Sequence, residues 1–125
     1  MSQNNYIINI PDHMKYMEVQ ISGVIELELL RALSTEVDNF MKMFDKKPET
    51  VKVLTDISKV SKVSIHSRKY GSKWVKKHPE FKIAFYGQSL FMKYILSVII
   101  KINNVEKTMQ FFKSKDKAIE WLNNT

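Results

Sequence analysis

Cysteine is absent from this chain of 125 residues, and glycine and proline occur only three times each. Without cysteine there is no disulfide framework, no thiolate nucleophile and no cysteine metal ligand. The glycines, Gly23, Gly71 and Gly87, lie far apart, so the chain has no glycine-rich phosphate loop. The absence of cysteine suits a reducing compartment, and we expect a cytoplasmic location.

Long hydrophobic runs are also missing. The longest apolar stretch, residues 90–102, is interrupted by Lys93, Ser97 and Lys101, so it is too short and too polar to span a bilayer. The first five residues are polar and are followed by no apolar run, so we predict no signal peptide and no membrane span.

Residues that carry catalysis are scarce. The three histidines, His13, His66 and His78, lie in separate segments without metal-ligand spacing. No serine sits in a Gly-x-Ser-x-Gly turn. A Ser58–His66–Asp56 triple can be drawn, yet any chain of this length offers such triples. We therefore predict no enzymatic activity, no metal site and no cofactor.

The composition is that of a globular protein, with 44% hydrophobic and 26% charged residues. A chain of 125 residues fits one domain around one core. We expect residues 1–125 to form a single domain.

Positive charge is concentrated in one region. The chain carries a net charge of +7, and residues 62–82 contain seven basic side chains and one acidic side chain. The predicted basic face consists of Arg68, Lys69, Lys73, Lys76 and Lys77. Such a surface either attracts anions or merely solvates the helix. We favour solvation, because lysine dominates and few aromatic residues interleave, and we find no specific signal for nucleic-acid binding.

Hydrophobic periodicity predicts nine elements. Short apolar or alternating runs predict strands at 6–10, 16–22, 51–57, 81–86 and 105–112. Spacings of three and four predict helices at 26–44, 64–77, 89–102 and 114–122. Gly23 is expected to end the second strand, and residues 58–63 are expected to form a link. The order β-β-α-β-α-β-α-β-α predicts an α/β fold with a mixed, mostly parallel five-stranded sheet and four helices.

Three segments then carry a family resemblance. The run from Leu54 to Ser58 (Leu-Thr-Asp-Ile-Ser) is similar to a strand ending in Asp-Leu-Ser in the STAS-like domains. The run Phe81–Gly87 is similar to their Arg-Ile-Ala-Val-Val-Gly strand, and Lys117–Leu122 to their Glu-Ala-Leu-Ala-Trp-Leu ending. With the element order, the chain resembles the stand-alone SpoIIAA-like branch, which is also compared with CRAL-TRIO lipid-binding domains. The resemblance implies a STAS-like fold and a non-enzymatic interaction or regulatory role.

One departure from that family concerns phosphorylation. Anti-sigma-factor antagonists carry Asp-Ser-Ser-Gly after the Asp-Leu-Ser strand, and a serine there is phosphorylated. The matching stretch here is Ser64-Ile65-His66-Ser67, with Ile65 in the place of that serine. Ser64 or Ser67 could take the place of that serine, but the motif itself is absent, so a phosphorylation switch stays a secondary hypothesis.

Polar residues near the predicted carboxyl ends of strands form a candidate ligand site, consisting of Asp56, Ser58, Ser89 and Lys93. The amides that begin the helix at Ser89 would suit an anion. The competing interpretation is structural: Asp56 bonds loop amides and Ser89 caps the helix. We favour the structural interpretation.

The segment 89–102 is apolar nearly all round, more than a core requires. A homodimer interface, a groove for an apolar ligand and a membrane-surface contact compete as explanations. We predict a homodimer whose interface includes Phe91, Ile95, Val98, Ile99 and Ile102. The alternative is a lipid or small amphipathic anion with its tail near Phe91, Ile95 and Val98 and its headgroup near Lys93 or Ser89. A further protein partner also stays open.

Overall fold

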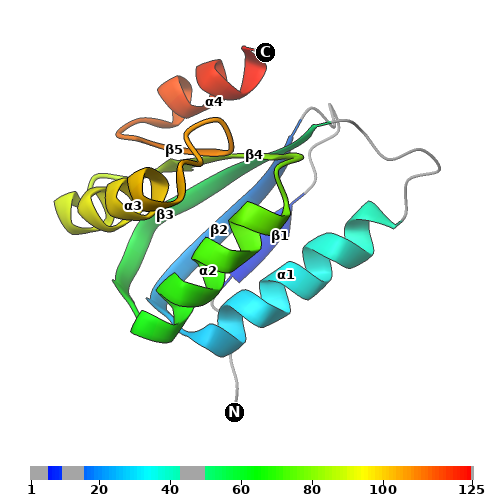
Figure 1. Ribbon diagram of the computed structural model, residues 1–125. Helices are drawn as coiled ribbons and strands as arrows, with labels where there is room; N and C mark the ends of the chain where they lie inside the picture. The colour runs from blue at the N-terminus through cyan, green and yellow to red at the C-terminus, as the bar shows by residue number, and fades with distance from the viewer. Residues whose placement is uncertain (1–5, 10–15, 43–49, 125) are drawn as a thin grey trace.

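A computed structural model describes residues 6–9, 16–42 and 50–124 of the chain (Figure 1). The strands are β1 (Tyr6–Asn9), β2 (Met17–Ile25), β3 (Val51–Val63), β4 (Phe81–Tyr86) and β5 (Met109–Phe112). The helices are α1 (Leu27–Met41), α2 (Ile65–Lys77), α3 (Leu90–Asn103) and α4 (Lys115–Asn123). This order confirms the predicted α/β sequence of elements.

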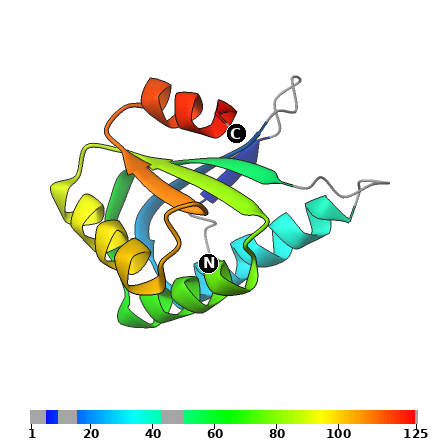
Figure 2. The ribbon, with the colours of Figure 1, turned by 45° about the horizontal axis from the view of Figure 1, so that its top comes forward.

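The five strands form one sheet in the order β1-β2-β3-β4-β5. β1 pairs with β2 antiparallel, and all other pairs are parallel, which confirms the mixed, mostly parallel sheet. From β2 to β5 the chain crosses the sheet in one direction, and connections between parallel strands are nearly always right-handed. Each crossover helix therefore lies on the same face of the sheet. Figures 1 and 2 show α1, α2 and α3 together on one face and α4 on the other.

The sheet therefore separates two hydrophobic clusters. Along β3, Val53 and Ile57 belong to the larger cluster under α1, α2 and α3. The intervening Leu54 faces the opposite way, as strand geometry requires, and packs with Ala84, Ala118 and Leu122 under α4.

The second and third strands are longer than predicted. β2 continues through Gly23 to Ile25, and β3 includes residues 58–63, where a link was expected. The pairing register shifts between Gln20 and Ser22 and again between Gly23 and Val24, and Gly23 has a φ of 77°. Each shift sets an extra β3 residue against β2, as a β-bulge does. Buried side chains then recur every third residue, at Ile57, Val60 and Val63, instead of alternating. The alternation expected of a strand is therefore absent from residues 58–63, and the sequence pattern did not predict a strand there.

The fifth strand is shorter than predicted. Residues 105–108 form a turn, in which the Val105 carbonyl accepts hydrogen bonds from the amides of Thr108 (2.9 Å) and Met109 (3.0 Å). Asn104, with a left-handed φ of 54°, ends α3 and redirects the chain. The expected extensions of β1 to residue 10 and of α1 to residue 44 reach outside the described residues, as does His13.

Candidate functional site

The four residues of the predicted ligand site, Asp56, Ser58, Ser89 and Lys93, do not form one site. Three of them make local structural hydrogen bonds, and Lys93 is exposed. Asp56 Oδ1 accepts hydrogen bonds from the Ser58 amide (2.9 Å) and hydroxyl (2.5 Å). Ser89 Oγ accepts the Met92 amide (3.2 Å) and so caps α3. Lys93 is exposed on α3. Within the described ranges, no hydrogen bond or ion pair joins Asp56 or Ser58 to Ser89 or Lys93.

Asp56 instead belongs to a polar cluster beside α4. It lies opposite Tyr86 in the β3–β4 ladder, and the neighbouring Glu18 forms an ion pair with Lys115 of α4 (3.6 Å). Burial raises the pKa of Tyr86 to about 12, aided by the charge of Asp56 and a hydrogen bond to it. Sequence reasoning missed Glu18 and Tyr86 as site residues. Glu18 alternates with the buried Met17 and Val19, whereas Tyr86 is a half-buried residue at the end of β4.

This cluster gives the domain an alkaline titration. The Tyr86 pKa is about 12 in the folded domain and 10.0 in an unfolded chain, so unfolded chains lose the proton first as pH rises. We therefore expect Tyr86 to destabilise the fold progressively between pH 10 and 12 and to have no such effect below pH 10. In an absorbance titration of tyrosinate, Tyr86→Phe should remove the last ionisation phase, and Asp56→Asn should shift it to lower pH. A Tyr86→Phe titration with the same last phase as wild type would contradict this assignment.

The imagined catalytic triple is not assembled. Ser58 donates its hydroxyl directly to Asp56, and within the described part of the chain no hydrogen bond links His66 to either residue. Nδ1 of His78 lies 3.3 Å from Oε2 of Glu80, so this histidine is paired with a nearby carboxylate. The described residues contain no group of three His, Asp or Glu side chains placed to hold a metal ion.

The stretch that matches the phosphorylation motif carries out structural roles. Ser64 caps α2 by accepting the Ser67 amide (3.1 Å). Ser67 is 1% exposed and donates its hydroxyl to the Ile25 carbonyl (2.9 Å), which ties α2 to the end of β2. Ile65, in the position of the phosphorylated serine, points to solvent.

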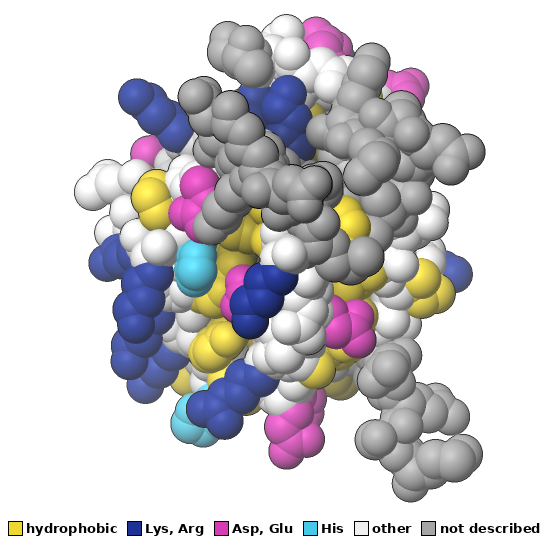
Figure 3. Space-filling view, turned by 90° about the vertical axis from the view of Figure 1, so that its right-hand side faces the viewer, with side chains coloured by type: hydrophobic (Ala, Val, Ile, Leu, Met, Phe, Trp, Pro, Cys, Tyr) yellow, Lys and Arg dark blue, Asp and Glu magenta, His cyan; other side chains and the backbone are white. Residues whose placement is uncertain are grey.

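The predicted basic face divides as well. Lys69, Lys73, Lys76 and Lys77 are exposed along α2, and Figure 3 shows basic side chains gathered in a column there. Arg68 is only half-buried as a residue, yet its Nε is buried without a hydrogen-bond partner among the described residues. Arg68 therefore differs from the four lysines and turns toward the interior.

Helix α3 presents apolar side chains on two sides. Its inner side contributes the buried Met92, Ile95, Leu96 and Ile100, with Ile99 partly buried. Five large apolar side chains remain exposed and are here called the α3 outer stripe: Leu90 (73%), Phe91 (49%), Tyr94 (69%), Val98 (36%) and Ile102 (72%). Of the predicted interface residues, Phe91, Val98 and Ile102 lie on this stripe. Ile95 and Ile99 instead face the domain's own core.

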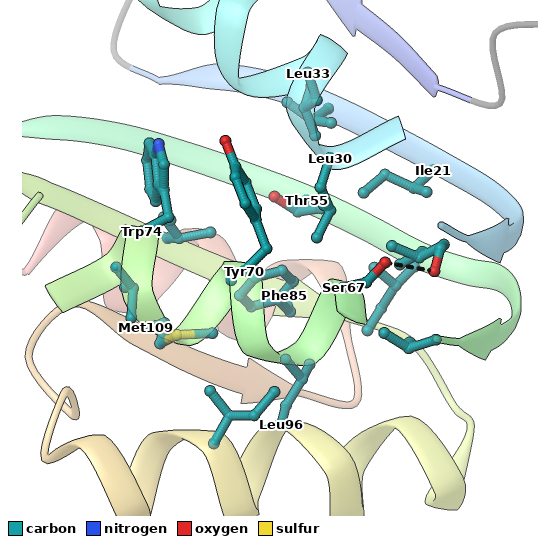
Figure 4. A pocket seen from close by; sticks show the side chains of 18 of the residues that line it. Ile21, Leu30, Leu33, Thr55, Ser67, Tyr70, Trp74, Phe85, Leu96 and Met109 are labelled. Carbon is teal, nitrogen blue, oxygen red and sulfur yellow. Dashed lines mark hydrogen bonds between the residues drawn. The ribbon is translucent and has the colours of Figure 1, made fainter. Parts of the chain in front are cut away.

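A cavity of about 180 Å³ lies between the sheet and helices α1, α2 and α3. Figure 4 shows Leu30 and Leu33 reaching it from α1, Tyr70 and Trp74 from α2, and Leu96 from α3. Its wall is almost entirely apolar, and Arg68 is among the few polar lining residues. Sequence reasoning missed this cavity, because it depends on how side chains from seven elements fill a shared volume.

Comparison with known families places the chain. A family model, described as a domain of unknown function (DUF7793), matches residues 12–125. The chain belongs to this family. No curated protein sequence matches the DUF7793 chain. Within the described residues, this domain has no helix with the length and apolar character needed to cross a membrane.

Solved structures share the fold of this DUF7793 domain. An uncharacterised protein of the DUF3478 family from Shewanella loihica PV-4, with a SpoIIAA-like fold, is 23% identical, with 98% of each chain covered and a TM-score of 0.69. An anti-sigma factor antagonist from Mycobacterium paratuberculosis is 17% identical, with 98% of each chain covered and a TM-score of 0.58. These likenesses confirm the predicted SpoIIAA-like, STAS-like fold.

Proposed function

We propose that this chain is a non-enzymatic, STAS-like interaction domain that forms a homodimer through the α3 outer stripe. The observation that carries the proposal is the exposure of five large apolar side chains on one helix. A contiguous apolar patch of this kind on a small domain marks an interaction site more often than chance exposure. The proposal also includes a cytoplasmic location, which the absence of cysteine suits.

The spacing of the stripe favours a second copy of the chain as occupant. Tyr94, Val98 and Ile102 follow one another at intervals of four residues, so they form one row along α3. A two-fold axis beside Val98 would set Tyr94 of each copy against Ile102 of the partner subunit. Such an isologous contact pairs every member of the row with an apolar side chain. Lys93 and Lys101 would stay at the rim, where their long side chains reach water.

The size of the stripe predicts a modest affinity. The exposed fractions amount to about three complete large apolar side chains, or on the order of 500 Å² per copy. A pair would then bury about 1,000 Å² from the stripe, which is near the lower limit for a specific interface. We therefore expect a dimer that dissociates in about the micromolar range.

A matched pair of charge substitutions tests the interface. Ile102→Glu places a carboxylate in the stripe, and Ile65→Glu places the same group on α2, where Ile65 is 64% exposed. We expect sedimentation equilibrium to give a dimer for wild type and Ile65→Glu, and a folded monomer of 14.7 kDa for Ile102→Glu. Dimers in all three samples would show that the stripe is not the interface, and monomers in all three would favour a different protein as its occupant.

The regulatory part of the proposal is supported by fold likeness and by the arrangement of the one catalytic triple considered, whose members are all described. One solved structure with this fold is an anti-sigma factor antagonist, a protein named for its action on an anti-sigma factor. In this chain, Asp56 and Ser58 bond each other, and neither bonds His66. A protein-binding role fits both observations better than catalysis does.

The alternative function is binding of a small amphipathic anion or lipid. The groove first considered for its tail, near Phe91, Ile95 and Val98, does not favour this function, because Ile95 faces the core and the other two face solvent. The cavity between the sheet and helices α1, α2 and α3 is a better-formed space for an apolar ligand.

A further inference from the structure

The cavity under α1, α2 and α3 is larger than a packing imperfection. Protein interiors contain few voids larger than a water molecule, and the destabilisation from a void grows with its volume. An apolar cavity of about 150 Å³ is large enough to bind benzene, and this one measures about 180 Å³. The space therefore fits a body of about six to ten carbon atoms.

A glycine in α2 keeps part of this space open. Gly71 lies inside the helix, where glycine costs about 1 kcal/mol relative to alanine. It lines the cavity, and a Cβ atom added there would meet no other atom within 4 Å. A larger residue would satisfy helix propensity and would have room at this wall of the cavity. Gly71 thus gives up helix stability at a position that borders the open space.

Arg68 supplies a charge at the cavity wall. Its Nε is buried, and no described residue accepts a hydrogen bond from it. A guanidinium group stays protonated, so an unpaired buried N–H needs an acceptor and favours an anionic one. Helix α2 contains no acidic residue that could serve. Because Arg68 is half-buried as a residue, it also reaches from the cavity toward solvent.

A hydroxyl group completes the polar part of the cavity. Thr55 is 3% exposed, and Figure 4 shows its side chain pointing into the cavity from β3. The hydroxyls of Ser34 and Ser67 also belong to the wall, but they donate to the carbonyls of Leu30 (2.7 Å) and Ile25 (2.9 Å). Thr55 has no side-chain hydrogen bond to the described residues, so it is available to a ligand.

We infer that this cavity binds a small apolar carboxylate, with the hydrocarbon body between the sheet and the helices and the carboxylate on Arg68. A carboxylate presents two acceptor oxygens to the guanidinium group, which matches the geometry of the fork. The volume of about 180 Å³ suits a short hydrocarbon body. The site is independent of the dimer proposal, because it lies on the inner side of α3.

Hexanoate and 1-hexanol test the inference by NMR titration of the ¹⁵N-labelled full chain. They share the hydrocarbon body and differ in charge. We expect both to shift the amides around the cavity saturably, with hexanoate bound at least tenfold more tightly. Arg68→Met keeps the apolar stem and should remove the advantage of hexanoate without weakening 1-hexanol. Gly71→Leu should abolish binding of both probes and raise the melting temperature.

Three results would overturn the inference. The first is the absence of saturable shifts from either probe in wild type. The second is equal affinity of hexanoate in wild type and Arg68→Met. The third is a response to acetate equal to that to hexanoate and confined to the α2 lysines, which would mean surface ion binding only. Ile102→Glu is expected to bind hexanoate as wild type does, so loss of the dimer and loss of the ligand site are distinguishable.

Discussion

An Ile95→Glu substitution is expected to unfold the domain, whereas Ile102→Glu, two turns further along α3, leaves it folded. Ile95 is 5% exposed and belongs to the larger core cluster, while Ile102 is 72% exposed. A carboxylate at position 95 would be buried in the apolar core. Such a change costs more than about 4 kcal/mol, which approaches the whole stability of a typical domain.

The comparison is measured by circular dichroism during urea denaturation. At position 102 the substitution touches solvent in the monomer, so at protein concentrations below the dimer dissociation constant its effect on the free energy of unfolding should stay within about 0.5 kcal/mol. The pair also bears on the interface, because monomers of Ile95→Glu would report unfolding and not dissociation. If Ile95→Glu unfolded with the same midpoint as wild type, the assignment of the inner and outer sides of α3 would be wrong.

Leu122→Ala has the second largest expected effect, because Leu122 fastens α4 to the sheet. Leu122 and Ala118 are both fully buried, against Leu54 and Ala84. The two alanines let the helix approach the sheet closely, so little neighbouring side chain can relax into a space left at position 122. We expect a loss of about 2–5 kcal/mol in the free energy of unfolding.

Glu120→Ala is the matched control on the same helix. Glu120 is exposed, and its ion pair with Lys117, at 4.0 Å between exposed side chains, adds little stability. Urea denaturation should show a change within about 0.5 kcal/mol for this variant. Equal effects of Leu122→Ala and Glu120→Ala would contradict the packing of α4 described above.

The sequence predicts the helix starts well because they depend on local chemistry. Ser64, Ser89 and Ser114 each accept an amide three residues ahead, at 3.1 to 3.2 Å. These hydrogen bonds involve only neighbouring residues. A serine just before a segment with apolar residues at helical spacing therefore reliably predicts the start of a helix. The strand ends are predicted less well, because β2 and β3 extend through bulges that pairing between the two strands stabilises. No local sequence signal near Gly23 indicates that β2 continues to pair with β3.

The candidate sites show the same limit. The apolar character of α3 predicts a surface beyond the core, but periodicity alone cannot say which side faces out when both are apolar. Ile95 and Val98 therefore looked equivalent, and the structure buries one and exposes the other. Arg68 likewise belongs to a basic run in the sequence, and its inward position follows from the packing of α2 against α1 and α3. Volume and orientation are properties of the assembled fold.

A single cysteine tests the central claim most directly, because the chain has none of its own. In a Val98→Cys variant, the proposed two-fold axis brings the two new thiols together. The account predicts that mild oxidation converts this variant into a disulfide-linked species of twice 14.7 kDa, reversible by reductant, while Ile65→Cys stays a monomer on denaturing electrophoresis. Equal, slow cross-linking of both variants would contradict a homodimer built on the α3 outer stripe.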